Sequence, residues 1–248
     1  MAIDPSSTAF DPTQFDAIYP PGVERHYWNI CRNAILARAV RAAGQGNVLE
    51  VGCGKGLVVA HLRAEGIEAR GVDLANVPAL PEVSAHVRTG VDLFDIAAEQ
   101  FIDVGIVLLL DVIEHIEQPA AFVERIRKHV PSAHTFIFTV PARQELFSNY
   151  DEFNRHFLRY DRSTLRSHVD TTGKRTWKAS YFFHALYPAA WLQLKLKGAR
   201  ETRYVVPVTG LQRAVHRLLG WIFLVDYFLL PAGIPGTSII ATVSEPQR

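Results

Sequence analysis

The sequence predicts an α/β protein with a doubly wound sheet, mostly parallel with a late antiparallel strand, plus a helical insertion. Between about residues 44 and 183, short apolar runs alternate with helical segments, which is the order of a parallel sheet covered by helices. One run, Val104–Leu110, is wholly apolar, as expected of a central strand buried on both faces. The first run, Val48–Val51, breaks into the glycine-rich turn Gly52–Gly56. Ligands of such sheets bind at the carboxyl ends of the strands, so this turn is the predicted site.

The predicted elements follow one another along the whole chain. Residues 1–22 contain four prolines and predict an irregular arm, and Glu24–Ala43 has apolar residues at helical spacing. In the sheet region we expect strands at Val48–Val51, Glu68–Asp73, Ala85–Arg88, Val104–Leu110 and Thr135–Val140, and helices at Leu57–Ala64 and Ala120–His129. Beyond it we expect a loop over the site at Phe147–Arg162, a helix at Arg162–Val169 capped by Asp161 or Ser163, and late strands at Arg175–Phe183 and Thr237–Val243.

Composition narrows the class of protein. A chain of 248 residues, 48% hydrophobic and 21% charged, fits one α/β domain with an insertion or two small domains. Its net charge of +1 gives no sequence-wide reason to expect a nucleic-acid partner. With two cysteines, no signal-peptide pattern at the N-terminus and no uninterrupted apolar run of about 18 residues, we expect a cytoplasmic protein without a transmembrane helix.

Four segments together carry a family resemblance. They are Glu50-Val-Gly-Cys-Gly-Lys-Gly56, Gly71-Val-Asp-Leu74, Leu109-Leu-Asp-Val-Ile-Glu-His115 followed by Pro119, and Pro141 followed by Asp151, His156, Arg159 and Tyr160. They resemble the class I S-adenosylmethionine-dependent methyltransferases of the bacterial small-molecule type. The third segment resembles the subset that includes the ubiquinone-biosynthesis O-methyltransferases. The likeness covers about residues 24–183, with Gly236-Thr-Ser-Ile-Ile240 fitting the closing strand. It implies a Rossmann-like fold, S-adenosylmethionine as cofactor and S-adenosylhomocysteine as product.

The resemblance also implies a set of cofactor-binding residues. They are Trp28, Arg32, Glu50, Gly52, Cys53, Gly54, Asp73, Leu74, Asp92, Leu93 and Leu110. Asp73 is suited to accept hydrogen bonds from both ribose hydroxyls, and Glu50 to order the glycine turn from behind. Asp92 is expected at the adenine amine, with Asp95 as the competing residue. The turn is not a dinucleotide-binding G-x-G-x-x-G, because Leu57 stands at the third glycine position.

The domain organisation follows from the same likeness. Residues 1–43 are expected to form an arm and a helix that covers the cofactor, where Arg32 either pairs with the cofactor carboxylate or stays solvated. Residues 44–183 form the Rossmann-like methyltransferase core, 184–236 an apolar helical insertion, and 237–248 the closing strand and tail.

Two histidines are candidates for the chemistry. His156 is the first candidate for a base, because it lies on a segment expected to cover the substrate; the alternative is that it packs against Asp151 or Tyr160. His115 is the second candidate. It ends a D-x-x-E-H segment similar to the E-x-x-E-H cluster proposed to hold a divalent metal in the ubiquinone subset. We favour the reading in which Asp111 caps the following turn and His115 packs beneath it, and we assign no metal.

The insertion at 184–236 leaves several readings open. It combines an apolar helical stripe with tryptophans and basic residues, which suits a lid over an apolar pocket, a dimer interface, a membrane-surface element or a buried core helix. The stripe consists of Leu211, Val215, Leu218, Ile222 and Val225. Arg155, Arg159 and Arg162 suit an anionic substrate or a solvated surface.

The functional prediction is methyl transfer to a small molecule, with oxygen as the favoured acceptor atom. The alternatives are transfer to nitrogen, to carbon or to a lipid- or glycan-linked acceptor, and, from another class, a cofactor-binding interaction protein without catalysis. The oligomeric state is left open.

Overall fold

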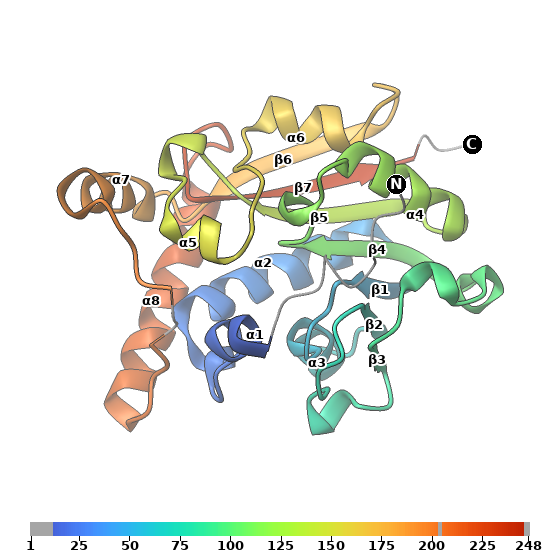
Figure 1. Ribbon diagram of the computed structural model, residues 1–248, viewed down its shortest axis with the longest axis horizontal. Helices are drawn as coiled ribbons and strands as arrows, with labels where there is room; N and C mark the ends of the chain where they lie inside the picture. The colour runs from blue at the N-terminus through green and yellow to red at the C-terminus, as the bar shows by residue number, and fades with distance from the viewer. Residues whose placement is uncertain (1–11, 203–204, 246–248) are drawn as a thin grey trace.

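A seven-stranded sheet forms the centre of the protein (Figure 1). The computed structural model describes residues 12–202 and 205–245. The strands are β1 (Asn47–Val51), β2 (Ala69–Asp73), β3 (Val87–Thr89), β4 (Val104–Leu110), β5 (Thr135–Pro141), β6 (Thr176–Phe182) and β7 (Ser238–Ser244). The helices are α1 (Pro12–Ile18), α2 (Tyr27–Ala43), α3 (Leu57–Ala64), α4 (Pro119–His129), α5 (Asn149–Phe153), α6 (Arg162–Val169), α7 (Leu186–Lys197) and α8 (Gly210–Leu229). Short 3₁₀ turns include η2 (Val23–Arg25), η4 (Leu93–Asp95) and η6 (Ile113–His115).

The sheet is mostly parallel, in the order β3-β2-β1-β4-β5-β7-β6. Strands β1 to β5 pair in parallel, whereas β7 runs antiparallel to both β5 and β6. Chain direction therefore reverses only at β7, the last strand of the sequence. This arrangement confirms the predicted α/β class with its late antiparallel strand, and the predicted strands and core helices lie within one or two residues of the observed ones.

Helices cover both faces of the sheet, and β4 shows why. Every residue of β4 is buried. Val107 and Leu109 point into a cluster closed by α4 and α6, while Ile106 and Leu108 point into a second cluster closed by α2, α3 and α8. A strand with apolar contacts on both sides has no need of polar residues, which explains its continuous apolar run.

The N-terminal arm differs from its prediction. Residues 1–11 lie outside the described part of the chain, but Pro12–Ile18 form α1 instead of irregular structure. Proline is tolerated at the first position of a helix, because the N–H that it lacks would have no partner there. Phe15 is buried and stacks on Tyr19, with ring centroids 5.8 Å apart. The arm therefore packs onto the domain.

The insertion forms α7 and α8, and α8 lies along α2 (Figure 1). The contact is close at Gly220, where an added Cβ would lie 2.7 Å from Cγ2 of Ile30. Phe223 is buried beside Tyr27. The stripe Leu211, Val215, Leu218, Ile222 and Val225 faces away and is 45% to 77% exposed, so reading it as a buried core helix is wrong. Within the described residues, no helix is long and apolar enough to cross a bilayer.

Candidate functional site

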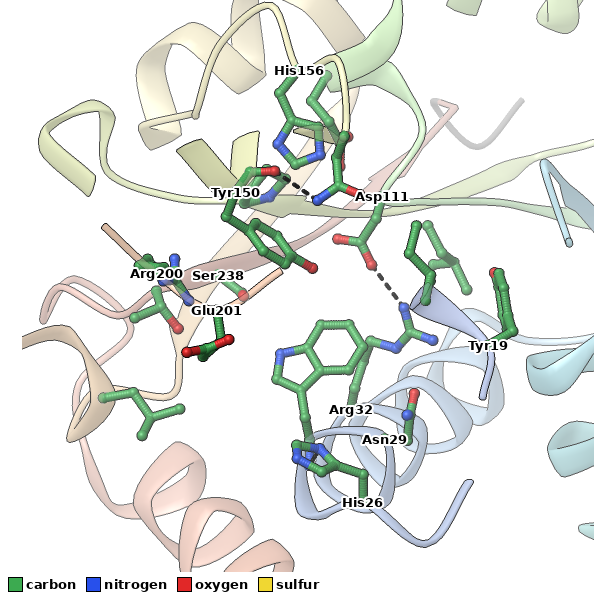
Figure 2. A pocket seen from close by; sticks show the side chains of 18 of the residues that line it. Tyr19, His26, Asn29, Arg32, Asp111, Tyr150, His156, Arg200, Glu201 and Ser238 are labelled. Carbon is green, nitrogen blue, oxygen red and sulfur yellow. Dashed lines mark hydrogen bonds and ion pairs between the residues drawn. The ribbon is translucent and has the colours of Figure 1, made fainter. Parts of the chain in front are cut away.

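A cavity of about 480 Å³ opens at the carboxyl ends of β1, β2 and β4, where the sheet topology predicts a ligand. The arm, α2 and the glycine turn line one end of the cavity. The segment after β5, α7 and the chain after α7 line the other end (Figure 2). Polar side chains around it include Tyr19, Asn29, Arg32, Asp73, Asp111, Glu114, His115, Tyr150, His156, Arg159, Arg200 and Glu201.

The glycine turn presents bare backbone to the cavity. Gly52 and Gly54 have left-handed φ angles of +77° and +55°, which glycine adopts without strain. A Cβ on Gly54 would lie 2.6 Å from the hydroxyl oxygen of Tyr19. The carboxylate of Asp73 accepts hydrogen bonds from the backbone N–H groups of Gly54 (2.6 Å) and Ala75 (2.7 Å). The turn and the end of β2 thus form one cradle, joined by backbone hydrogen bonds, in which the hydroxyl of Tyr19 lies close to Gly54.

Burial raises the pKa of both carboxyl groups at this end. Glu50 lies behind the turn and is buried; burial raises its pKa to about 8, the charge of Arg32 opposes the rise and that of Asp73 adds to it. Burial also raises the pKa of Asp73, against the two backbone hydrogen bonds, which favour its ionised form. Only Asp73 of this pair lines the cavity, so it is the acid available to a ligand.

An ion pair crosses the middle of the cavity. Nη1 of Arg32, on α2, lies 2.7 Å from Oδ2 of Asp111, at the exit of β4 (Figure 2). The guanidinium also lies 4.4 Å from the ring centroid of Trp28. Asp111 has a φ of +55°, a conformation that aspartate tolerates better than most residues. In this conformation the carboxylate of Asp111 reaches Arg32 on α2.

The far end is built around the buried carboxylate of Asp151. Its Oδ1 lies 2.8 Å from Nδ1 of His156 and 2.8 Å from Nε of Arg159. Burial would raise the pKa of Asp151, but the hydrogen bond from His156 and the charge of Arg159 outweigh it, so the pKa is lowered. An ionised Asp151 accepts a hydrogen bond from the N–H at Nδ1 of His156, which leaves Nε2 as a proton acceptor.

Two further groups adjoin His156. The backbone N–H of Phe157 donates to the carbonyl of Glu114 (2.8 Å), which joins the segment after β5 to η6. The rings of His115 and His156 meet edge to face, with centroids 4.6 Å apart. Burial, then the charge of His156, lowers the pKa of His115 to about 3, so its ring is neutral near pH 7.

Glu114 gives this cluster the composition of a metal site. Its side chain is fully buried, and neither carboxylate oxygen has a hydrogen-bond partner among the described residues. Burial, then the charge of Asp111, raises its pKa well above the usual value. One ligand atom from each of Glu114, His115 and His156 lies within 4.8 Å of the others, so the three fit a divalent ion. Asp111 does not belong to this cluster, because it faces Arg32.

The outer wall comes from α5 and the chain after α7. The side-chain amide of Asn149 donates to the carbonyl of Arg200 (2.9 Å), and its Oδ1 accepts from the N–H of Arg200 (2.8 Å). The guanidinium of Arg200 lies 5.3 Å from the ring centroid of Tyr150. Tyr150 lies beside Asp111, and Arg200 lies on the side of the cavity away from Tyr19 (Figure 2).

The predicted site residues fall into two groups. Those that line the cavity are Trp28, Arg32, Gly52, Gly54, Asp73, Leu110, His115 and His156. Those that do not line it are Glu50, Cys53, Leu74, Asp92 and Leu93. Asp92 caps η4 by accepting a hydrogen bond from the N–H of Phe94 (2.9 Å). Of the three arginines suggested for an anionic substrate, Arg159 lines the cavity but is paired with Asp151.

Tyr19 and Arg200 were missed. Tyr19 lies in the arm that was expected to be irregular, and Arg200 in a segment with no motif. A useful signal would have been the pair Phe15 and Tyr19, whose spacing of four residues places both rings on one side of a helical turn.

The chain is similar to known methyltransferases. Residues 24–178 match the family model of a methyltransferase domain. A curated relative, the ubiquinone biosynthesis O-methyltransferase of Acinetobacter baumannii (strain ACICU), is 28% identical over 117 residues. That match covers 44% of this chain and 49% of the relative, so the chain matches about half of that protein's length.

Solved structures agree on the fold. The methyltransferase domain of bacterial CtHen1 is similar with a TM-score of 0.52 at 12% identity, over 88% of this chain and 99% of that one. Phosphoethanolamine N-methyltransferase 2 of Haemonchus contortus, solved with S-adenosyl-L-methionine, is similar with a TM-score of 0.53 at 17% identity. That likeness covers 98% of this chain and 58% of the other. At such identities the structures support the fold alone.

Proposed function

The chain belongs to the methyltransferase-domain family, and from this premise we propose that it transfers a methyl group from S-adenosylmethionine to the oxygen of a small molecule. The observation that carries the proposal is the single cavity that joins the Gly52–Gly54 turn and Asp73 to the His156–Asp151 pair. One end fits a nucleoside with an amino-acid tail, and the other holds a group that can take a proton.

The cofactor end is assigned to the glycine turn. The glycines of the turn let the methionine portion lie against the backbone. The remaining lone pairs of the Asp73 carboxylate can accept hydrogen bonds from the ribose hydroxyls. Arg32 can receive the cofactor carboxylate. When bound, the cofactor supplies a methyl group activated by its bond to a sulfonium sulfur, and loss of that methyl group leaves a neutral thioether.

The acceptor end is assigned to His156. The ionised Asp151 keeps the proton on Nδ1 of His156, so Nε2 can take the hydroxyl proton as the new O–CH₃ bond forms. Asp151 is a positioning residue in this scheme. Tyr150 and Arg200 close the cavity beside it and suit a hydroxylated acceptor with a negative group. Support for oxygen as the acceptor atom comes from this base and from the O-methyltransferase likeness.

The acceptor end of the cavity also suits a divalent ion, which is a second candidate role for these residues. Glu114, His115 and His156 would hold it, and the observation that favours it is the buried, unpartnered carboxyl of Glu114. An ion there would polarise the acceptor oxygen. The two uses differ in their response to a chelator, because proton transfer to His156 needs no ion.

Methyl transfer to nitrogen or carbon, and a cofactor-binding protein without catalysis, are the alternatives. Two free, buried cysteines support placing the protein in the reducing cytoplasm as part of the proposal.

Four experiments on the purified chain test the proposal. Calorimetry with S-adenosylmethionine and S-adenosylhomocysteine should give binding, and the absence of both would refute the cofactor assignment. A panel of phenolic, carboxylic and amine acceptors, followed by mass spectrometry, should give methylated product at oxygen. Cofactor binding without any product would favour the non-catalytic alternative. His156→Gln should lower turnover about 10²- to 10⁴-fold and leave cofactor affinity unchanged. EDTA should leave wild-type turnover unchanged. A loss of turnover in EDTA would instead favour the divalent ion at Glu114, His115 and His156.

A further inference from the structure

The surface of α8 that faces away from the domain is unusually apolar. The stripe Leu211, Val215, Leu218, Ile222 and Val225 continues to Leu229, with intervals of four and three residues that keep it on one side of the helix. Leu211 and Leu229 are 77% and 76% exposed. Trp221 and Phe228 are also exposed. A surface helix of a globular protein normally buries such a stripe against the core. Here the core contact uses the other side, through Gly220 and Phe223.

Helix α7 lies at the same end of the molecule as α8 (Figure 1) and also carries exposed apolar side chains. Trp191, Leu192 and Leu196 are exposed, and the chain between the two helices adds Val205 and Val208. Single exposed apolar side chains are ordinary, but a set this large on adjacent elements marks a surface that binds something apolar.

The charged residues in this part of the chain are mostly basic. Residues 185–236 contain six Lys or Arg and only two Asp or Glu, although the whole chain has a net charge of +1. Of the two acids, Glu201 lines the cavity and Asp226 lies 2.9 Å from Nδ1 of His184. Arg213 and Arg217 on α8, and Lys195 and Lys197 at the end of α7, are exposed.

These observations select between two occupants. In a symmetric dimer through α8, the basic residues of both copies would gain no acidic partner, because each copy carries the same excess of positive charge. An anionic lipid surface instead attracts the basic residues while its acyl chains accept the apolar stripe. We propose that α7 and α8 dock the protein on an anionic phospholipid membrane, with α8 lying in the plane of the interface.

Docking places the cavity near the bilayer. The inner side of α7 contributes Leu186, Ala189, Ala190 and Gln193 to the cavity wall, while its outer side carries the exposed Trp191 and Leu192. Helix α7 therefore contributes both to the cavity wall and to the exposed apolar surface. The docking proposal does not depend on the proposed methyl transfer, and its test requires neither cofactor nor acceptor.

The test is co-sedimentation with vesicles of phosphatidylcholine alone or mixed with phosphatidylglycerol. Wild-type protein should sediment with the mixed vesicles and less so as salt rises. The double variant Leu218→Asp/Ile222→Asp should weaken binding at least about 100-fold, because it removes two large side chains from the lipid and adds repelling charge. The matched control is Ile102→Asp, since Ile102 is 80% exposed on the turn before β4 and should behave as wild type.

A second pair of variants tests the charges without altering the stripe. Arg213→Gln/Arg217→Gln should weaken binding about 25-fold, from roughly fivefold for each charge near an anionic surface. The control is Lys128→Gln, an exposed cation on α4.

Three results would overturn the proposal. One is wild-type protein that remains in the supernatant with the mixed vesicles; another is a stripe variant that binds like Ile102→Asp. The third is a wild-type dimer, seen by light scattering, that the stripe variant converts to a monomer while vesicle binding is absent throughout. That result would assign the surface to a second copy of the chain.

Discussion

The two ends of the cavity are built in different ways. The glycine turn is held through backbone groups, because Asp73 accepts hydrogen bonds from the backbone N–H groups of Gly54 and Ala75. The far end is held by side chains: Asp151 is buried between His156 and Arg159, and Asn149 fixes the backbone of Arg200. The first is one short segment and the end of the neighbouring strand. The second gathers residues from α5, the segment after it and the chain after α7.

The difference indicates how each end can change. A backbone cradle depends on few residues and recognises a constant ligand, whereas a cluster of side chains can be replaced one by one to suit another acceptor. If this division is right, substitutions at the two ends should affect different measurements: affinity for the cofactor at one end, and turnover at the other.

The largest expected effect is that of Asp151→Asn. Without the carboxylate, the proton on Nδ1 of His156 is no longer favoured and the charge of Arg159 loses its buried partner. We expect turnover to fall about 10²- to 10⁴-fold and the free energy of unfolding to fall by about 3 kcal/mol, with little change in cofactor affinity.

Asp170→Asn is the matched control, because Asp170 is also buried and lies 3.5 Å from Arg175, outside the cavity. It should destabilise the protein without lowering the turnover of the folded fraction. Equal loss of turnover in both variants would mean that Asp151 acts only through stability.

Next in size is Asp73→Asn. Hydrogen bonds to a charged acceptor are worth about 1.5–3 kcal/mol each, so losing the charge toward two ribose hydroxyls should weaken S-adenosylmethionine binding about 10²- to 10³-fold. Turnover at saturating cofactor should change little. Asp92→Asn is the comparison, because Asp92 already caps η4 and does not line the cavity; its effect on affinity should be smaller. Titration calorimetry measures both, and a larger effect at Asp92 would reverse the assignment.

Glu50→Gln concerns stability at the cofactor end. The pKa of Glu50 is raised from 4.5 to about 8, so between these values the folded protein keeps a proton that the unfolded chain has lost. The stability contributed by Glu50 should therefore fall as pH rises through this range, by up to about 1.4 kcal/mol for each pH unit.

The glutamine variant should show a flatter pH dependence, measured by urea unfolding at several pH values between 5 and 8. The exposed residue Glu82 provides the control variant Glu82→Gln. An unchanged slope in Glu50→Gln would show that Glu50 is already ionised in the folded protein.

The same contrast explains what the sequence could predict. Contiguous sequence patterns predict the strands, the limits of the helix Leu57–Ala64 and the glycine turn, because local periodicity and backbone freedom determine these elements. Pairing between distant residues left no such pattern: Arg32 and Asp111 are 79 positions apart. The stripe on α8 was visible as a periodic face, but periodicity does not say what covers a face. The arm was assigned from its prolines, whereas the burial of Phe15 decides its helix.

The smallest effect should come from the ion pair between the two ends. If Arg32 receives the cofactor carboxylate as proposed, binding has to compete with the 2.7 Å contact between Arg32 and Asp111. Asp111→Asn should therefore tighten cofactor binding about fivefold, a coupling near 1 kcal/mol, and Arg32→Ala should weaken it. In the Arg32→Ala background, Asp111→Asn should have no further effect, because the competitor has lost its partner. Calorimetry on the four proteins completes the cycle. If Asp111→Asn weakens binding instead, Asp111 itself contacts the cofactor, and the two ends share a residue.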